Sequence, residues 1–294
     1  MREFSGVLVA TLLVSFGSSF LAAQDNADLG GPPKVLVIQR EFLKPGKSGS
    51  THEKSEGAFV RAMAASKSGS HYLAMDSLTG TKRSLFFSRY DSFAAWEEDN
   101  KNIEKDATLT AALDRAALAD GELLSDYDTG VFLYQAELSM PAPVNIGQMR
   151  YMEILSFNVK EGHRKEWNEL VGTYKAAYQK GEPNAQWAMY EKEYGGEMGV
   201  FLMIRPMKSA AEVDHLMTAG ETVRSAMSEA DRAKVAELAA VCIGSSASNL
   251  YKFNPKISYA TDQMIQADPA FWKQRAAATR PEAKPRQQEG SPVQ

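Results

Sequence analysis

The chain has 294 residues, and 33 Lys plus Arg stand against 37 Asp plus Glu, for a formal net charge of −4. Hydrophobic residues make up 44% and charged residues 24%, which excludes a mostly disordered chain, a collagen-like repeat and a multi-span membrane protein. The charge balance offers no basic face for nucleic acid, and the single cysteine, Cys242, excludes an internal disulfide and any metal centre built from cysteines.

The first 23 residues have the pattern of an export signal. Arg2 lies at the start, an apolar run covers residues 6–21, and the small residues Ala22 and Ala23 follow. This order is typical of a secretory signal peptide. The alternative is an uncleaved anchor, but the run is short for a span of about 20 apolar residues. We predict cleavage after Ala23, no stable membrane span afterwards, and a periplasmic or secreted protein.

The rest of the chain divides by composition. The C-terminal segment has three prolines and no aromatic residue, which favours disorder. The expected divisions are a polar leader at 24–33, a first folded unit at 34–140, a linker at 141–147, a second unit at 148–255, a partly helical extension at 256–280 and a disordered tail at 281–294.

The first unit alternates β-rich runs with helical stretches. Gly80 lies in a short loop between two apolar runs, which predicts a hairpin. The expected elements are a strand at 35–42, a helix at 51–65, hairpin strands at 71–75 and 84–90, two helical pieces within 91–124, and a strand at 131–138.

The second unit repeats this order. Trp167, Leu170, Val171 and Tyr174 have helical spacing and predict an amphipathic helix. Ser209 has capping-box spacing to the glutamate three residues later, which predicts a helix start there. The expected elements are a strand at 149–159, a helix at 164–179, strands at 185–191 and 199–205 around a Gly-Gly hairpin, helices within 209–241, and a strand at 248–253.

Each unit therefore has the order β-α-β-β-α-β, the ferredoxin-like arrangement of an antiparallel sheet with helices on one face. The other face also needs a cover, and the simplest cover is the second sheet. The sequence predicts an α+β fold in which two tandem ferredoxin-like units form an internal, pseudo-dimeric α/β barrel. We expect any pocket to differ between the two halves.

A turn after each first strand, Lys44-Pro45-Gly46 and Lys160-Glu161-Gly162, adds to this element order. On these features the chain, from Lys34 to about Phe253, resembles the dimeric α/β-barrel superfamily. Its members include antibiotic-biosynthesis-monooxygenase-like and NIPSNAP-like domains, with chlorite dismutase-like proteins as tandem relatives. The superfamily includes monooxygenases, isomerases, haem proteins and domains without known activity, so the resemblance implies a fold rather than one reaction.

His52 and Glu56 are four residues apart and share one helix face. In the register of the second unit, His52 takes the place of Trp167. One interpretation is a pocket between helix and sheet, with His71 at the start of the neighbouring strand. The other, which we favour, is a frayed helix start with both side chains in water, because two polar groups at one helical spacing are a weak signal.

Arg89 and Arg205 end strands that correspond in the two units. A guanidinium matches carboxylate geometry, so each arginine is a candidate ligand-binding residue for an anion. The alternative is a structural role, with each arginine bridging to a carboxylate or capping nearby carbonyls. The repetition favours the structural role.

Glu153 lies in a strand and shares its face with apolar residues, which makes it a candidate general base. The alternative is that it pairs with Arg150 or Arg205 near the barrel rim. Three aromatic side chains are candidates for the walls of the same pocket: Trp187, Tyr190 and Tyr251.

No P-loop, dinucleotide fingerprint, nucleophile elbow or metal motif is found, so NTPase, dehydrogenase and hydrolase classes have no support. We predict an exported barrel that binds a small apolar or aromatic ligand, or a partner, without a cofactor or metal. The alternative is a cofactor-independent monooxygenase-like or isomerase-like enzyme in which Glu153 or His52 moves a proton. Haem binding is less favoured, because its candidate axial ligands, His163 and His215, are expected to face outward.

Overall fold

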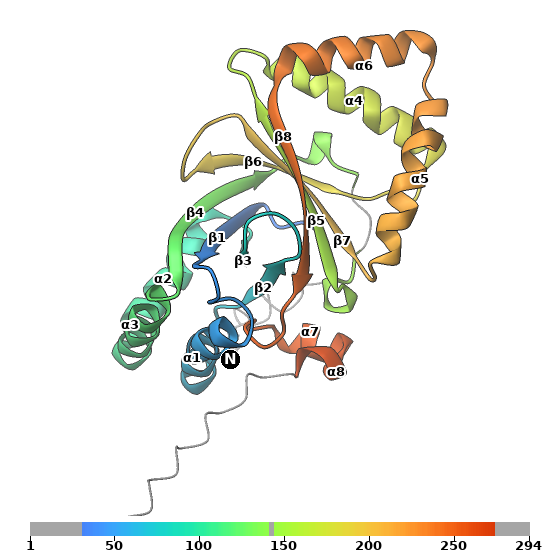
Figure 1. The fold of residues 1–294 in the computed structure, drawn as a ribbon. Coiled ribbons are helices and arrows are strands. Elements are labelled where there is room, and N and C mark those ends of the chain that lie inside the picture. The colour runs from blue at the N-terminus through green and yellow to red at the C-terminus, as the bar shows by residue number, and fades with distance from the viewer. Residues whose placement is uncertain (1–30, 141–143, 274–294) are drawn as a thin grey trace, which may run out of the picture.

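A computed structural model describes residues 31–140 and 144–273 (Figure 1). The predicted signal at 1–23 and tail at 281–294 lie outside the described residues. Eight strands form one closed antiparallel barrel, in the order β1-β3-β2-β8-β5-β7-β6-β4. The predicted α+β barrel is confirmed at this level, because the sheet closes on itself and the helices lie outside it.

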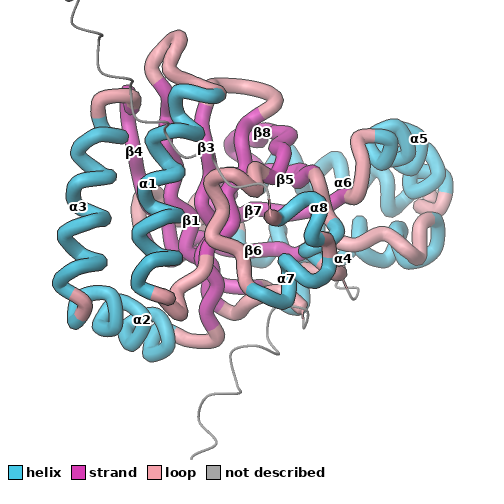
Figure 2. Tube along the Cα trace, turned by 90° about the horizontal axis from the view of Figure 1, so that it is seen from below, coloured by secondary structure: helices cyan, strands magenta, loops and turns pink. Residues whose placement is uncertain are grey.

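The first half contributes four neighbouring strands of this barrel, with its helices packed on their outer face (Figure 2). Its elements are β1 Val35–Leu43, α1 Ser50–Ser66, β2 Tyr72–Ser77, β3 Arg83–Tyr90, α2 Phe93–Lys105, α3 Ala107–Gly121 and β4 Leu124–Tyr134.

The second half contributes the other four strands, and its long helices α4, α5 and α6 lie on the opposite side of the barrel, whereas the short α7 and α8 lie near α1 (Figure 1). Its elements are η1 Ala136–Leu138, η2 Ile146–Gln148, β5 Tyr151–Val159, α4 Arg164–Gly181, β6 Ala188–Tyr194, β7 Val200–Met207, α5 Ala211–Ser225, α6 Glu229–Cys242, β8 Ile243–Phe253, α7 Asp262–Ala267 and α8 Pro269–Trp272.

Helix α5 begins differently from the sequence prediction. Ala210 is its N-cap and makes no side-chain capping bond, so the predicted capping box at Ser209 is wrong. The side chain of Glu212 instead accepts a hydrogen bond from the backbone N–H of Lys208 at 2.7 Å. The capping box of this region lies at α6, where Ser228 and Asp231 satisfy each other's backbone N–H groups.

Alternate residues of each strand point into the barrel. Large apolar side chains fill the interior and form part of one core, which includes Ile38, Met75, Leu85, Phe132, Ile154 and Tyr251.

Two seams close the barrel between the halves. β2 pairs with β8 only from Met75 to Ser77, and β4 pairs with β6 with a register shift after Val131. At the second seam Gly195 has φ +90°, and a Cβ there would collide with the carbonyl oxygen of Thr129. Glycine therefore permits the close approach that this seam needs. None of the described helices has the length and apolarity needed to cross a membrane.

Candidate functional site

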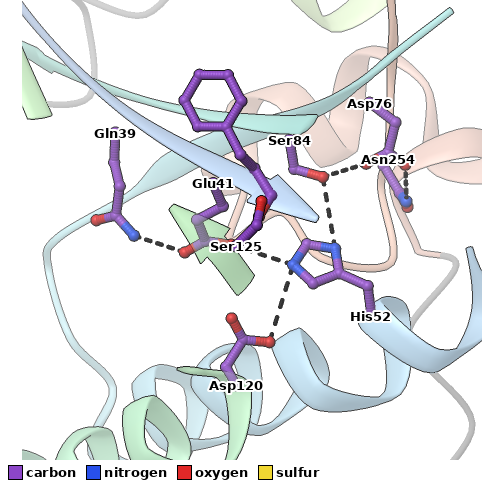
Figure 3. Close-up of polar contacts among 9 residues, drawn as sticks. Gln39, Glu41, His52, Asp76, Ser84, Asp120, Ser125 and Asn254 are labelled. Atoms are coloured by element: carbon purple, nitrogen blue, oxygen red, sulfur yellow. Dashed lines mark hydrogen bonds and ion pairs between the residues drawn. The ribbon is translucent and has the colours of Figure 1, made fainter. Parts of the chain in front are cut away.

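Four polar side chains are buried together between the helices and the sheet of the first half. Strand β1 supplies Glu41, helix α1 supplies His52 and Glu56, and helix α3 supplies Asp120. We call these four residues the charged cluster; Figure 3 shows Glu41 and Asp120 converging on the imidazole of His52. The His52 Nε2 atom lies 3.1 Å from Glu41 Oε2 and 3.8 Å from Asp120 Oδ1.

The favoured expectation that His52 and Glu56 lie in water is wrong, since they are 2% and 3% exposed. Helix α1 is formed from Ser50 onward, so its first turns pack on the sheet instead of fraying. The structure therefore places the polar pair in the layer where the second half has Trp167.

The cluster brings three carboxyl groups into a buried site, where ionised carboxylates are unfavourable. Burial, together with the charges of Glu41 and Asp120, raises the pKa of Glu56 well above its ordinary value. Burial also raises the pKa of Asp120. Burial alone would lower the pKa of His52, but the hydrogen bond that the imidazole donates to Glu41 and the charge of Asp120 outweigh it and raise that pKa. The arrangement thus favours any positive charge placed among the three carboxylates.

A chain of hydrogen bonds orients the imidazole. Ser84 Oγ lies 3.4 Å from His52 Nδ1 and donates to Asp76 Oδ1 at 2.5 Å. Asn254 Nδ2 donates to the other oxygen of Asp76 at 2.7 Å. Figure 3 shows this path running away from the carboxylates that face Nε2. These contacts therefore fix the imidazole from its Nδ1 side, and Nε2 is directed into the charged cluster.

One end of the barrel interior is an apolar pocket of about 110 Å³. Trp187 Nε1 donates to the Leu138 carbonyl at 2.9 Å, and the Tyr190 hydroxyl donates to the Pro33 carbonyl at 3.1 Å. Because these polar atoms are already bonded, the two rings offer apolar surface to the pocket. Arg89 lies in the same lining, so the structure brings together three of the predicted ligand-binding residues.

The opposite end of the barrel is cationic. Arg40, Arg83 and Lys192 line a cavity of about 500 Å³, together with the predicted Tyr251. The Tyr251 hydroxyl accepts a hydrogen bond from Arg83 Nε at 2.8 Å, and Arg40 pairs with Asp128 at 2.5 Å. Burial and the charge of Arg40 lower the pKa of Lys192. Tyr251 thus belongs to a different pocket from Trp187 and Tyr190.

Glu153 lines neither barrel pocket. Its neighbours Met152 and Ile154 point into the barrel, so Glu153 lies on the outer face, where Arg205 Nη1 donates to it at 2.5 Å. Arg150 pairs with Asp268 instead. The hypothesis that Glu153 is a catalytic base in the aromatic pocket is therefore wrong in its geometry, and the alternative pairing with Arg205 is the one observed.

Arg89 and Arg205 do not occupy equivalent positions. Val35 pairs with Tyr90, whereas the corresponding Tyr151 pairs with Met207, so the two strands align one residue away from the sequence comparison. A one-residue shift moves a side chain to the other face of a sheet. Arg89 accordingly lines the barrel pocket, while Arg205 faces outward. The assumed equivalence of the two positions is therefore wrong. The favoured structural contacts are nevertheless present, because Arg205 pairs with Glu153 and Arg89 Nη2 donates to the Gly31 carbonyl at 3.0 Å.

The remaining histidines lie away from both pockets and the cluster. His71 stacks on the ring of Tyr259, with centroids 4.8 Å apart. Of the second-half pair, His215 is exposed and contacts Glu182 at 3.2 Å, and His163 lies beside Glu166 at the start of α4. The sequence analysis did not identify Glu41 or Asp120. The one sequence signal for the cluster was Glu41 itself, which lies two residues beyond Gln39 on the helix-facing side of β1.

Comparisons with known proteins give matches of structure only: no protein-family model matches the chain, and no curated protein matches its sequence. A candidate monooxygenase from Fusobacterium nucleatum subsp. nucleatum ATCC 25586 is 10% identical, with a TM-score of 0.48 over 76% of this chain and 93% of that one. A chlorite dismutase variant from Candidatus Nitrospira defluvii is 9% identical, with a TM-score of 0.47 over 83% and 99%. An anthrone oxidase-like protein is 16% identical, with a TM-score of 0.45 over 78% and 94%. These values assign no activity to the chain.

Proposed function

We propose that the protein binds a small, largely apolar molecule in the pocket lined by Trp187, Tyr190 and Arg89. One observation carries this proposal: the pocket is a preformed apolar space inside the barrel, with the polar atoms of both aromatic rings bonded elsewhere. Preformed apolar pockets with few polar groups are the usual form of small-molecule sites. The guanidinium of Arg89 favours a ligand with one acidic or carbonyl group.

The lining also supports binding over proton transfer. Among the described residues that line this pocket, Arg89 and Tyr190 are the titratable ones. Burial raises the pKa of the Tyr190 hydroxyl, which stays protonated and bonded to the Pro33 carbonyl. A cofactor-independent enzyme acting on an apolar or aromatic substrate is the alternative function, and the experiment below includes a readout for it.

The test titrates the full protein with 1-anilinonaphthalene-8-sulfonate, an aromatic anion that fluoresces in apolar surroundings. Saturable binding of one equivalent is expected. Ala188 lies on β6 and lines the pocket, so Ala188→Phe fills it and abolishes the signal. Arg89→Met weakens binding about tenfold, the size expected for a lost charge-assisted bond of ~1.4 kcal/mol. Arg83→Met, at the other end of the barrel, is the matched control and keeps wild-type affinity.

Unchanged binding in Ala188→Phe would place the probe elsewhere and reject the proposal. Naphthalene incubated with the protein in air gives the second readout. Recovery of unmodified naphthalene agrees with a binding protein, whereas a hydroxylated product identifies the enzyme alternative. Native mass spectrometry of protein from its own host then identifies the molecule that travels with it.

We also infer that the mature protein is exported and that its two halves are copies of one ferredoxin-like unit. Support for export comes from the apolar run at 6–21 and the small residues that follow. Support for duplication comes from the strand order, since each half has its last strand beside its first and its third beside its second. Sequencing the mature N-terminus tests export, and a start at Gln24 is expected.

A further inference from the structure

We propose that Glu41, His52, Glu56 and Asp120 bind one divalent ion of the first transition series. Each residue offers one ligand atom, and these atoms all lie within 4.8 Å of one another. They come from β1, α1 and α3, so the folded first half assembles the site from three elements. The site lies on the outer face of the sheet and is separate from both barrel pockets.

The spacing suits a small ion. Bonds of about 2.0–2.2 Å to a tetrahedral metal place the ligand atoms roughly 3.4 Å apart. The distances from His52 Nε2 to Glu41 Oε2 and to Asp120 Oδ1, 3.1 and 3.8 Å, lie on either side of that value. Small side-chain rotations therefore bring these atoms to bonding distance.

Two buried oxygens in the cluster, Glu56 Oε1 and Asp120 Oδ1, accept no hydrogen bond from an N–H or hydroxyl group of the described residues. The Glu56 and Asp120 carboxyl groups can hydrogen-bond to each other only when one of them is protonated. Buried polar atoms in folded proteins nearly always have a partner. No described lysine or arginine forms an ion pair with these carboxylates or with Glu41. A cation at the centre of the group supplies a partner for both oxygens and balances the carboxylate charge in place of a proton.

The hydrogen bonds behind His52 agree with this assignment. Ser84 gives its one hydroxyl proton to Asp76, so it can only accept a hydrogen bond from His52 Nδ1. Nδ1 then carries a proton, and the lone pair of Nε2 is directed at the carboxylates unless a second proton occupies it. A ligating histidine commonly has this form, with its distal N–H bonded to an oxygen that is itself held by a carboxylate.

The donor set selects the class of ion. Three carboxylate oxygens and one imidazole nitrogen suit Zn²⁺, Fe²⁺ or Mn²⁺. The absence of a thiolate from the set disfavours Cu⁺, and the imidazole disfavours Mg²⁺ and Ca²⁺, which prefer oxygen ligands alone. All four residues are buried, so the bound ion is enclosed and joins α1 and α3 to β1.

The test uses the full chain without a polyhistidine tag, stripped with a chelator and titrated with Zn²⁺, Mn²⁺ or Co²⁺ alone. We expect one equivalent per chain, a higher melting temperature with the ion, and Co²⁺ absorption bands of a low-symmetry site. His52→Gln should lose the Co²⁺ bands and bind at least tenfold more weakly. His215→Gln is the matched control, because His215 also lies 3.2 Å from a glutamate but is exposed.

Glu56→Gln keeps the shape of a protonated glutamate, so the variant should fold. It distinguishes a cluster that binds a metal ion from one that binds protons. Weaker ion binding in this variant supports the metal site. If the wild type binds none of the three ions and Glu56→Gln melts higher than the wild type, the cluster holds protons and the proposal is overturned. Equal loss of binding in His215→Gln would place the ion at surface histidines and overturn it as well.

Discussion

The two halves of the barrel fill the same space between helix and sheet in opposite ways. In the second half Trp167 packs on Phe157 and Phe201, with ring centroids 5.1 and 5.0 Å apart. The strand pairings give Glu41 opposite Ser84 in the first half where Phe157 lies opposite Phe201 in the second. One backbone arrangement therefore accepts an aromatic core on one side and a charged cluster on the other.

The second half shows that the fold does not require charge in this layer. Apolar burial holds α4 on its sheet, and Trp167 and Phe201 are almost completely buried. The first half instead buries Glu41, Glu56 and Asp120, each at a cost in free energy unless a proton or cation compensates it. The proposed ion would compensate the buried charge of the first layer, and the second layer needs no such compensation.

The aromatic layer gives the largest expected change. Trp167→Ala leaves a cavity under α4 and should lower the free energy of unfolding by about 3–5 kcal/mol. Urea denaturation measures this loss. Tyr174 lies on the same helix and is exposed, so Tyr174→Ala should change stability by no more than about 0.5 kcal/mol. Equal losses in the two variants would contradict the comparison.

Converting the charged layer into an apolar one should stabilise the metal-free protein. The combined replacements Glu41→Met, His52→Phe, Glu56→Met and Asp120→Leu keep side-chain volume while removing the buried charges. We expect a gain of about 1–4 kcal/mol, the range measured when buried ion pairs are replaced by packed hydrophobic residues. The same variant should bind no Zn²⁺. Lower stability than the metal-free wild type would show that the polar contacts hold the layer together.

Metal-free wild-type protein should lose stability as the pH rises from 5 to 8. The folded state raises the pKa of Glu56, Asp120 and His52 above their ordinary values of 4.5, 3.8 and 6.5. Each group therefore stabilises the fold at low pH, and that contribution is lost as the pH rises through the folded pKa. The charges of the neighbouring acids Glu41 and Asp76 contribute to the raised pKa values of His52 and Glu56. Urea midpoints across this range should fall for the wild type and stay flatter in the apolar variant.

The helix caps of the second half give the smallest effect. Ser228→Ala removes the capping box of α6 and should cost about 1 kcal/mol. Ser209 makes no capping bond to α5, so Ser209→Ala should leave the urea midpoint unchanged. A loss in Ser209→Ala equal to that in Ser228→Ala would show that the sequence pattern, rather than the observed cap, governs stability.

The sequence pattern predicted a strand at or beside each position in the barrel, because alternating and β-rich runs are local signals. The fourth was misplaced: it was predicted at 131–138, but β4 runs from Leu124 to Tyr134 and a short 3-10 helix follows it. The start of strand β8 shows where these local signals fail. It was predicted from residue 248 but begins at Ile243, through polar residues whose pairing with β5 makes them a strand. That extension depends on a partner far along the chain, which no local pattern contains.

The candidate sites were predicted only in part, because they depend on which face each side chain occupies. Arg89, Trp187 and Tyr190 were singled out and meet in one pocket, but Glu153 and Tyr251 do not join them. The charged cluster combines β1, α1 and the end of α3, and Asp120 lies far from His52 in sequence. Its assembly depends on tertiary packing, so spacing alone gave two of its four members.

The short seams of the barrel also bear on how copies of this chain can meet. Inside the two halves β1 pairs with β3 from Val35 to Phe42 and β5 pairs with β7 from Tyr151 to Asn158, whereas β2 meets β8 only from Met75 to Ser77. Separation of the halves exposes the edges of β2, β4, β6 and β8. Unpaired strand edges readily form hydrogen bonds with strands of other molecules. A second opened molecule offers matching edges, so two chains can close two barrels by exchanging halves. We expect such exchanged dimers after refolding at high concentration, and more of them in Gly195→Ala, whose added methyl group collides with Thr129 at the other seam.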